Sequence, residues 1–176
     1  MENNRCLYCW GSLRLAREGA SFCSQKCGTY YRRRSLPREL TSRAKWVRHD
    51  AQKRPVCPRT GRLVDVTDPR AWCSYKVARE SSHGVGMGFV LSDDDDIACI
   101  DLDGVLGDGP VPAGVRKIIE STTGVFMVER SRSGAGLHVW FRTDERLGSN
   151  RVEDGIRVER YSRARYIAVT GLRLGL

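Results

Sequence analysis

Four cysteines near the N-terminus place the tightest constraint on how this chain can fold. Two residues separate Cys6 from Cys9, three separate Cys23 from Cys27, and thirteen lie between the two pairs. Two close thiolate pairs joined by a loop are a frequent signature of a structural zinc site, because together they supply four tetrahedral ligands. So short a segment buries too little apolar surface to fold stably without a metal. The pattern predicts a Zn²⁺-binding module over residues 1–34, with four free buried cysteines or a redox pair as the alternatives.

The remaining cysteines, Cys57, Cys73 and Cys99, have no ligand spacing, and we expect them to be ordinary packing or surface residues. The N-terminus lacks the apolar segment of a secretory signal, and no stretch approaches the roughly 18 apolar residues that span a bilayer. We therefore expect metal binding rather than disulfides. The expected location is the cytoplasm, the host cytoplasm if a phage encodes the chain, with no membrane contact.

The formal net charge is +9 and arginine dominates the basic residues, many of them in the first third of the chain. Basic side chains that neutralise phosphates release counterions, so this charge favours a nucleic-acid partner, although it also serves solubility. Two tyrosines followed by three arginines offer base stacking and phosphate contacts together, and the alternative is a solvated basic helix end. The expected nucleic-acid-binding residues are Tyr30, Tyr31, Arg32, Arg33 and Arg34.

The chain divides into a cysteine-rich module over 1–34, a basic linker over 35–52 and a core over 53–176. Four prolines predict irregular structure between residues 35 and 82: Pro37, Pro55, Pro58 and Pro69. From Gly84 onward, short apolar runs alternate with turn residues. Strands are predicted at Met87–Leu91, Ile97–Leu102, Val125–Glu129, Leu137–Phe141, Ile156–Tyr161 and Arg165–Val169, and a helix over Pro112–Thr122 that ends at Gly124. The first two strands and the last two are expected to pair as hairpins, which gives an α+β sandwich.

An apolar strand that ends in Asp101-Leu102-Asp103 carries the main chemical signal. Residues two apart on a strand point to one face, so the two carboxylates project together. Such a pair can hold Mg²⁺ or Mn²⁺ and activate phosphate chemistry, or it can be two surface aspartates at a strand end. The nearby run Asp93–Asp96 lies in a turn and is predicted to be a solvated acidic loop.

Two further elements could complete a site. The loop Ser131–Gly136 carries glycines, which let a backbone approach a ligand and turn its N–H groups toward phosphate, and His138 follows at the start of a strand. Glu159 lies in an alternating strand, on the same face as Arg157 and Tyr161, and could be a third carboxylate. Read alone, the histidine can be structural and the glutamate can be an exposed partner of an arginine.

In combination these elements resemble the bifunctional DNA primase/polymerase family, within the archaeo-eukaryotic primase superfamily, from about Lys53 to Gly171. The matching motifs occur in order: Arg54-Pro55 with Thr60-Gly61, Thr67–Trp72, Gly86–Leu91, Ile100–Asp103, Ser133–His138, Val158–Tyr161 and Arg165–Gly171. The N-terminal segment also looks like short zinc motifs that end in Cys-Ser-x-x-Cys and continue into a basic helix.

The resemblance implies an RRM-like antiparallel or mixed sheet with helices. It implies that Asp101, Asp103 and Glu159 hold Mg²⁺ or Mn²⁺, and that His138, Ser133, Gly134, Gly136 and Arg165 bind the triphosphate of a nucleoside triphosphate. The implied activity is nucleotidyl transfer by two metal ions on a single-stranded DNA template, in phage or plasmid-type replication.

The chain ends five residues after Gly171, where relatives commonly continue into helices or a helicase domain, so a separate replicative helicase is an expected partner. Two other functions stay open. The chain could be a non-catalytic, zinc-dependent nucleic-acid-binding protein on a degenerate scaffold of this type, or a metal-dependent nuclease.

Overall fold

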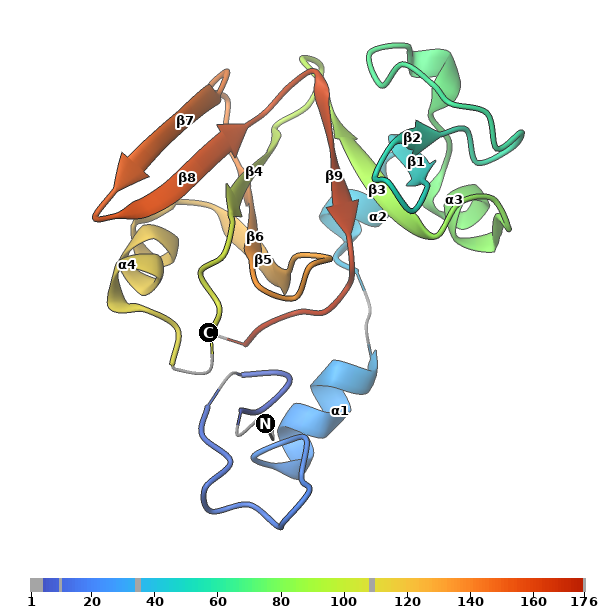
Figure 1. Cartoon of the computed structure of the whole chain (residues 1–176). Helices are drawn as coiled ribbons and strands as arrows, with labels where there is room; N and C mark the ends of the chain where they lie inside the picture. Colours follow the sequence, from blue (N-terminus) through green and yellow to red (C-terminus); the bar gives the residue numbers. More distant parts are fainter. Residues whose placement is uncertain (1–4, 10, 34–35, 108–109, 176) are drawn as a thin grey trace.

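The protein is built on two antiparallel sheets. The computed structural model describes residues 5–9, 11–33, 36–107 and 110–175. Within these ranges one sheet has the strand order β2-β1-β3-β9 and the other has the order β5-β6-β4-β8-β7 (Figure 1). Every paired strand runs antiparallel to its neighbour. The α+β class expected from the sequence is confirmed, and the finer RRM-like assignment stays a prediction.

The elements follow one another in a simple order. The helices are α1 (Gln25–Arg33), α2 (Arg38–Thr41), a 3-10 turn (Pro69–Ala71), α3 (Tyr75–Glu80) and α4 (Ala113–Ser121). The strands are β1 (Trp46–His49), β2 (Pro55–Val56), β3 (Gly86–Leu91), β4 (Ile97–Leu102), β5 (Val125–Arg130), β6 (Leu137–Arg142), β7 (Gly148–Glu153), β8 (Ile156–Tyr161) and β9 (Arg165–Val169). No helix among these is long and apolar enough to cross a membrane.

The six predicted strands are present within one residue of their expected bounds, but β1, β2 and β7 were not predicted, the segment expected to be irregular contains α2, β1, β2 and α3, and both predicted hairpins are wrong. β3 pairs with β1 and β9 in one sheet, whereas β4 pairs with β6 and β8 in the other. Likewise β8 and β9, which follow each other in the chain, lie in different sheets. The reason is burial: β3 and β4 are apolar runs rather than alternating ones, and such strands have neighbours on both edges. The short segments between these strands therefore carry the chain from one sheet to the other.

The segment expected to be a basic linker belongs to the folded core. Residues 35–52 contribute α2 and β1, and Leu40 and Trp46 within them are fully buried. The Trp46 indole nitrogen donates to the Leu40 carbonyl oxygen over 3.2 Å, which fixes the bend between the two elements. Pro55 begins the edge strand β2, where its missing N–H leaves no ladder bond unmade. We propose that the core begins near Leu36 rather than at Lys53.

Two apolar clusters hold the sheets in place. The first lies between the five-stranded sheet and α4, and includes Ile100, Leu102, Val139 and Val158. The second joins the two sheets through Trp46, Phe89, Trp140 and others. Phe89 meets Trp46 and Trp140 edge-on, with ring centroids 5.4 and 6.0 Å apart. One face of the five-stranded sheet is thus covered by α4, and the other faces the second sheet.

The acidic turn after β3 forms ion pairs with neighbouring segments and differs from the solvated loop expected there. Asp95 is buried and lies 2.9 Å from Arg43, and Asp96 lies 2.6 Å from both Arg43 and Arg142. Only Asp93 and Asp94 keep mainly exposed side chains. Asp95 and Asp96, in the turn between β3 and β4, thus connect that turn to Arg43, which lies between α2 and β1.

Candidate active site

A row of polar side chains crosses one face of the five-stranded sheet. In the strand register Glu129 lies opposite His138, His138 opposite Asp101, and Asp101 opposite Glu159. Directly opposed residues on neighbouring strands project to the same face. Asp101, His138 and Glu159, distant in sequence, therefore stand side by side on β4, β6 and β8, and Asp103 follows just beyond the end of β4.

The alternation of β4 decides which side chains face this row. Ile100 and Leu102 point into the cluster under α4, so Asp101 between them points the other way. Asp101 is partly buried, and its Oδ1 atom is buried without a hydrogen-bond partner. Burial raises the pKa of Asp101, and the neighbouring carboxylates of Asp103 and Glu159 raise it further, against the opposing effect of His138.

His138 lies between two acidic side chains. Its Nδ1 atom is 3.3 Å from Glu129 Oε1 and its Nε2 atom is 3.7 Å from Asp101 Oδ1. Burial lowers the pKa of His138, but the hydrogen bond to Glu129 and the nearby Asp101 and Asp103 outweigh burial, so the net direction is upward. The imidazole is thus held close to the site and favoured in its charged form.

Glu159 is buried within the row but is already engaged by its own neighbours. Its Oε1 atom accepts from Arg157 over 2.6 Å and from Asn150 over 3.1 Å. Its Oε2 atom accepts from the Tyr161 hydroxyl over 2.6 Å. The plainer interpretation, an exposed glutamate cross-strand from an arginine, holds only in part: the arginine pair is present, but Glu159 is buried and Arg157 lies on the same strand.

A cavity of about 580 Å³ opens over the row. Asp101, Asp103, His138 and Glu159 line it together with basic side chains from four segments. These basic residues are Lys53, Arg132, Arg157 and Arg165. Arg165 also lies over the Tyr161 ring at 4.2 Å, which holds its cation beside the carboxylates. A cavity with acidic residues at one place and basic residues around them suits an anionic ligand bound through a cation.

The glycine loop borders this cavity, but its N–H groups close the loop itself. The backbone N–H groups of Gly134 and Gly136 donate to the carbonyl and the hydroxyl of Ser131, over 3.0 and 3.1 Å. The Ala135 N–H donates to the Ser133 hydroxyl over 3.3 Å. Of this loop, Ser131 and Arg132 line the cavity, whereas Ser133, Gly134 and Gly136 shape the turn.

Gly136 has a steric reason to be glycine. A Cβ atom there would lie 2.7 Å from the Leu102 carbonyl oxygen and 2.9 Å from the Ser131 hydroxyl. The loop backbone can therefore pass directly over the end of β4, next to Asp103. Gly134, by contrast, has open space around it and a φ of +79°, which calls for glycine through backbone conformation alone.

The residues of the row fit a divalent cation. Asp101 offers a buried oxygen that nothing else satisfies, beside a second carboxylate that repels it. Hard cations such as Mg²⁺ and Mn²⁺ take oxygen ligands of this kind. The three carboxylates are less compact than the cysteine cluster, which in the described part of the chain is the one group whose ligand atoms all lie within 4.8 Å.

The four N-terminal cysteines form that compact cluster. Cys9 Sγ is 3.4 Å from Cys23 Sγ, which is 3.6 Å from Cys27 Sγ. Sulfurs bound tetrahedrally to zinc at 2.3 Å lie about 3.8 Å apart, so the set fits such an ion. Although Cys6 is buried, backbone N–H groups of Cys9, Cys23 and Tyr8 lower its pKa to about 7, which favours the thiolate. The three other cysteines lie outside the cluster, as expected.

The aromatic residues expected to contact nucleic acid pack within the cysteine-rich segment. Tyr30 stacks on Tyr8 with ring centroids 5.5 Å apart, and Tyr31 lies 5.1 Å from Phe22. Tyr30 keeps one exposed side. Arg32 and Arg33 continue α1, and Arg34 lies outside the described residues.

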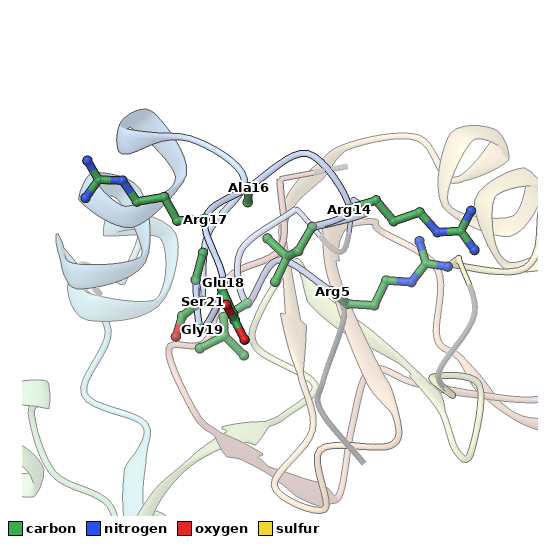
Figure 2. Close-up of a pocket in the computed structure, with 10 residues that line it drawn as sticks. Arg5, Arg14, Ala16, Arg17, Glu18, Gly19 and Ser21 are labelled. Carbon is green, nitrogen blue, oxygen red and sulfur yellow. The ribbon is translucent and has the colours of Figure 1, made fainter.

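A second hollow, of about 630 Å³, lies in the loop between the cysteine pairs. Figure 2 shows Arg5 and Arg14 extending side by side on one side of it, and Arg17 on the other. These arginines were not singled out from the sequence, because their spacing carries no motif. The hollow therefore combines three arginines with one acidic residue, Glu18.

Sequence reasoning also missed Glu129, Lys53 and Arg132. No motif marks Glu129, which simply follows the apolar run of β5 and whose full burial is seen only in the structure. Lys53 and Arg132 gave no signal either, because they reach the cavity from loops of different sheets. Arg132 donates to the Asp50 carbonyl over 3.2 Å and so spans from the glycine loop to the end of β1.

Comparison with known proteins adds an independent finding. The chain is similar in sequence to an enzyme of DNA priming and synthesis. This relative is the DNA primase-polymerase of Nitratiruptor phage NrS-1, which is 33% identical over 137 residues. The match covers 72% of the chain but only 18% of the length of the relative. No family model matches the chain.

Proposed function

We propose that this chain is the nucleotidyl-transfer core of a DNA primase-polymerase that works with divalent cations. The observation that carries the proposal is the row Asp101, His138 and Glu159 on three adjacent strands, at the floor of a cavity with basic walls. Similarity to a protein of that name supports it. In the reaction, the 3′ oxygen of a primer bonds to the α-phosphorus of a nucleoside triphosphate and pyrophosphate leaves.

The carboxylates and the basic residues have separate roles in this proposal. Asp101, Asp103 and Glu159 would hold Mg²⁺ or Mn²⁺, which supplies charge neutralisation at the reacting phosphate. Lys53, Arg132 and Arg165 face the same cavity and bind phosphate oxygens, because guanidinium and ammonium groups donate to them strongly. His138 presents Nε2 toward Asp101 and the cavity, within reach of the triphosphate.

The cysteine-rich segment is proposed to bind Zn²⁺ and to contact single-stranded DNA. Its hollow gathers Arg5, Arg14 and Arg17, and Tyr30 keeps an exposed face on α1. Such contacts to phosphates are sequence-independent and weaken with salt. A replicative helicase provided by another chain is part of the same proposal.

The test is incorporation of labelled nucleotides on a primed single-stranded template with Mg²⁺ or Mn²⁺. We expect wild type to lengthen the primer and an Asp101→Asn, Asp103→Asn double variant to lose at least about 100-fold of that activity. The matched control is Asp144→Asn, an exposed aspartate of the loop after β6. Equal products from wild type and the double variant would end the proposal, and shortening of the strand would indicate a nuclease.

The arrangement of Glu159 favours a second candidate function, nucleic-acid binding without catalysis. Its two oxygens are occupied by Arg157, Asn150 and Tyr161, so one of the three expected metal ligands is already engaged. This alternative predicts salt-dependent DNA binding that survives the double aspartate variant but not Cys23→Ser, together with no incorporation by wild type.

A further inference from the structure

Glu129 is a fully buried carboxylate that the proposed chemistry does not use. It has no exposed surface and does not line the cavity. A buried carboxylate is strongly destabilising unless hydrogen bonds satisfy it. Here both oxygens are satisfied: Oε1 accepts from Trp140 Nε1 over 3.0 Å, and Oε2 accepts from the backbone N–H groups of Thr170 and Gly171 over 3.0 and 2.8 Å. These three N–H groups can only donate, and together they fix the orientation of the carboxylate.

The fixed carboxylate determines which nitrogen of His138 keeps its proton when the imidazole is neutral. Indole and backbone N–H groups only donate, so Glu129 acts toward all its neighbours as an acceptor. His138 Nδ1 lies 3.3 Å from Oε1, and a hydrogen bond across that distance requires a proton on Nδ1. Nε2 is then the ring nitrogen that faces Asp101 Oδ1, at 3.7 Å, and the cavity.

We propose that Glu129 is a positioning residue, which holds the His138 imidazole with Nδ1 protonated and Nε2 directed to the cavity. The proposal deepens the proposed function and rests on it for the catalytic consequence. Partners that orient a metal-ligating histidine from behind typically contribute about 10–100-fold to affinity or activity, and we expect the same scale for His138. Register places Glu129, His138 and Asp101 directly opposite one another on β5, β6 and β4, so the sheet itself sets the distances.

Glu129 also has a structural role, and the test must separate that role from its effect on His138. Through Oε2 it ties Thr170 and Gly171, the start of the C-terminal segment, to β5. Thr170 Oγ1 adds a contact of 3.0 Å to the same oxygen. Thr170→Val removes the hydroxyl contact to Glu129 Oε2 and leaves the Glu129–His138 contact in place. It is therefore the matched control for lost packing.

The decisive variant is Glu129→Gln. A carboxamide has one oxygen and an NH₂ group, and the two backbone N–H donors at Oε2 outnumber the single Trp140 N–H at Oε1, so the oxygen faces the backbone and the indole loses its acceptor. The NH₂ group then faces His138 Nδ1, which has to become an acceptor and leave its proton on Nε2. We therefore expect the variant to reverse the tautomer of His138, whereas Thr170→Val keeps it.

The measurement is the ¹⁵N NMR pattern of the histidine rings in the full chain, at a pH where they are neutral. A His138→Gln variant identifies the signals of His138 among those of the three histidines. We expect Nδ1–H at His138 in wild type and Nε2–H in Glu129→Gln. Wild-type protein with Nδ1 unprotonated, or an unchanged tautomer in the variant, would overturn the proposal. If the variant does not fold, the wild-type spectrum alone decides.

Incorporation assays supply the second readout. In Glu129→Gln we expect kcat to fall about 10–100-fold with a smaller change in KM, and less than about 3-fold loss in Thr170→Val. If both variants lose activity equally, Glu129 acts through packing and the proposal is wrong. If wild type incorporates nothing, the proposed function fails while the tautomer measurement still decides the role of Glu129.

Discussion

Lys45 and Asp95 form a buried ion pair, with 3.1 Å between the ammonium nitrogen and the carboxylate, and their side chains are only 11% and 2% exposed. Asp95 also lies 2.9 Å from Arg43, so loss of its charge removes two ion pairs, although Lys45 keeps Asp94 at 2.7 Å. We expect Asp95→Asn to lower the free energy of unfolding by about 3 kcal/mol, or Tm by roughly 6–12 °C for a chain of this size. Thermal unfolding followed by circular dichroism measures this.

Asp93→Asn provides the comparison within the same turn. Asp93 is 69% exposed and lies 3.6 Å from Arg146, so its ion pair is screened by water. We expect a change within about 0.5 kcal/mol. Equal losses from the two variants would show that the turn is a solvated loop, as the sequence alone indicated.

The glycine loop gives a second pair of variants. In Gly136→Ala the new methyl group meets the Leu102 carbonyl oxygen, so the loop and the end of β4 have to separate, beside Asp103. We expect a loss of about 1–3 kcal/mol in stability and a larger proportional loss of nucleotide incorporation. Gly134→Asn introduces a residue that tolerates positive φ at a position with open space around it, so we expect almost no change in stability or activity. Calorimetry and primer extension on both variants test the difference.

Local patterns in the sequence predicted six of the nine described strands, because each of these apolar runs is bounded by turn residues, whereas β1, β2 and β7 were missed. The same patterns could not predict which strands pair: the segment between β3 and β4 is short enough for a hairpin, and only the burial of both strands separates them into two sheets. Asp101 and His138 stood out by their motifs. Glu129 and Arg132 did not, since a role that depends on cross-strand register or on a contact between sheets leaves no local pattern.

The unsatisfied oxygen of Asp101 predicts opposite effects of Asp101→Asn on stability and on metal binding. Because burial raises the pKa of Asp101, ionisation is unfavourable in the folded state, and this destabilisation is present once the pH is above the folded pKa. The variant should therefore be more stable than wild type at neutral pH, by about 2–4 °C in Tm per kcal/mol relieved, and the gain should vanish in acid below the ordinary aspartate pKa. Added Mn²⁺ should raise the Tm of wild type but not of the variant.

The control for this prediction is Asp144→Asn, which should respond to pH and Mn²⁺ as wild type does. A variant less stable than wild type at neutral pH would mean that Asp101 is satisfied by a partner in solution. An equal response of both proteins to Mn²⁺ would place the cation elsewhere.

The cysteine cluster predicts one Zn²⁺ per chain, released by Cys23→Ser but retained by Cys57→Ser, whose thiol lies outside the cluster. Zinc should also steady the C-terminal segment, because the Gly175 N–H donates to the Tyr8 carbonyl over 3.2 Å, next to Cys9. Leu174 and Leu172 continue this segment along β5, on either side of Glu129. Zinc content measured with a chromogenic chelator, and amide exchange of residues 172–175, should therefore change together in Cys23→Ser. Exchange that stays slow after zinc is lost would show that the segment is held by β5 alone, and stoichiometric zinc in Cys23→Ser would rule out the cluster as its site.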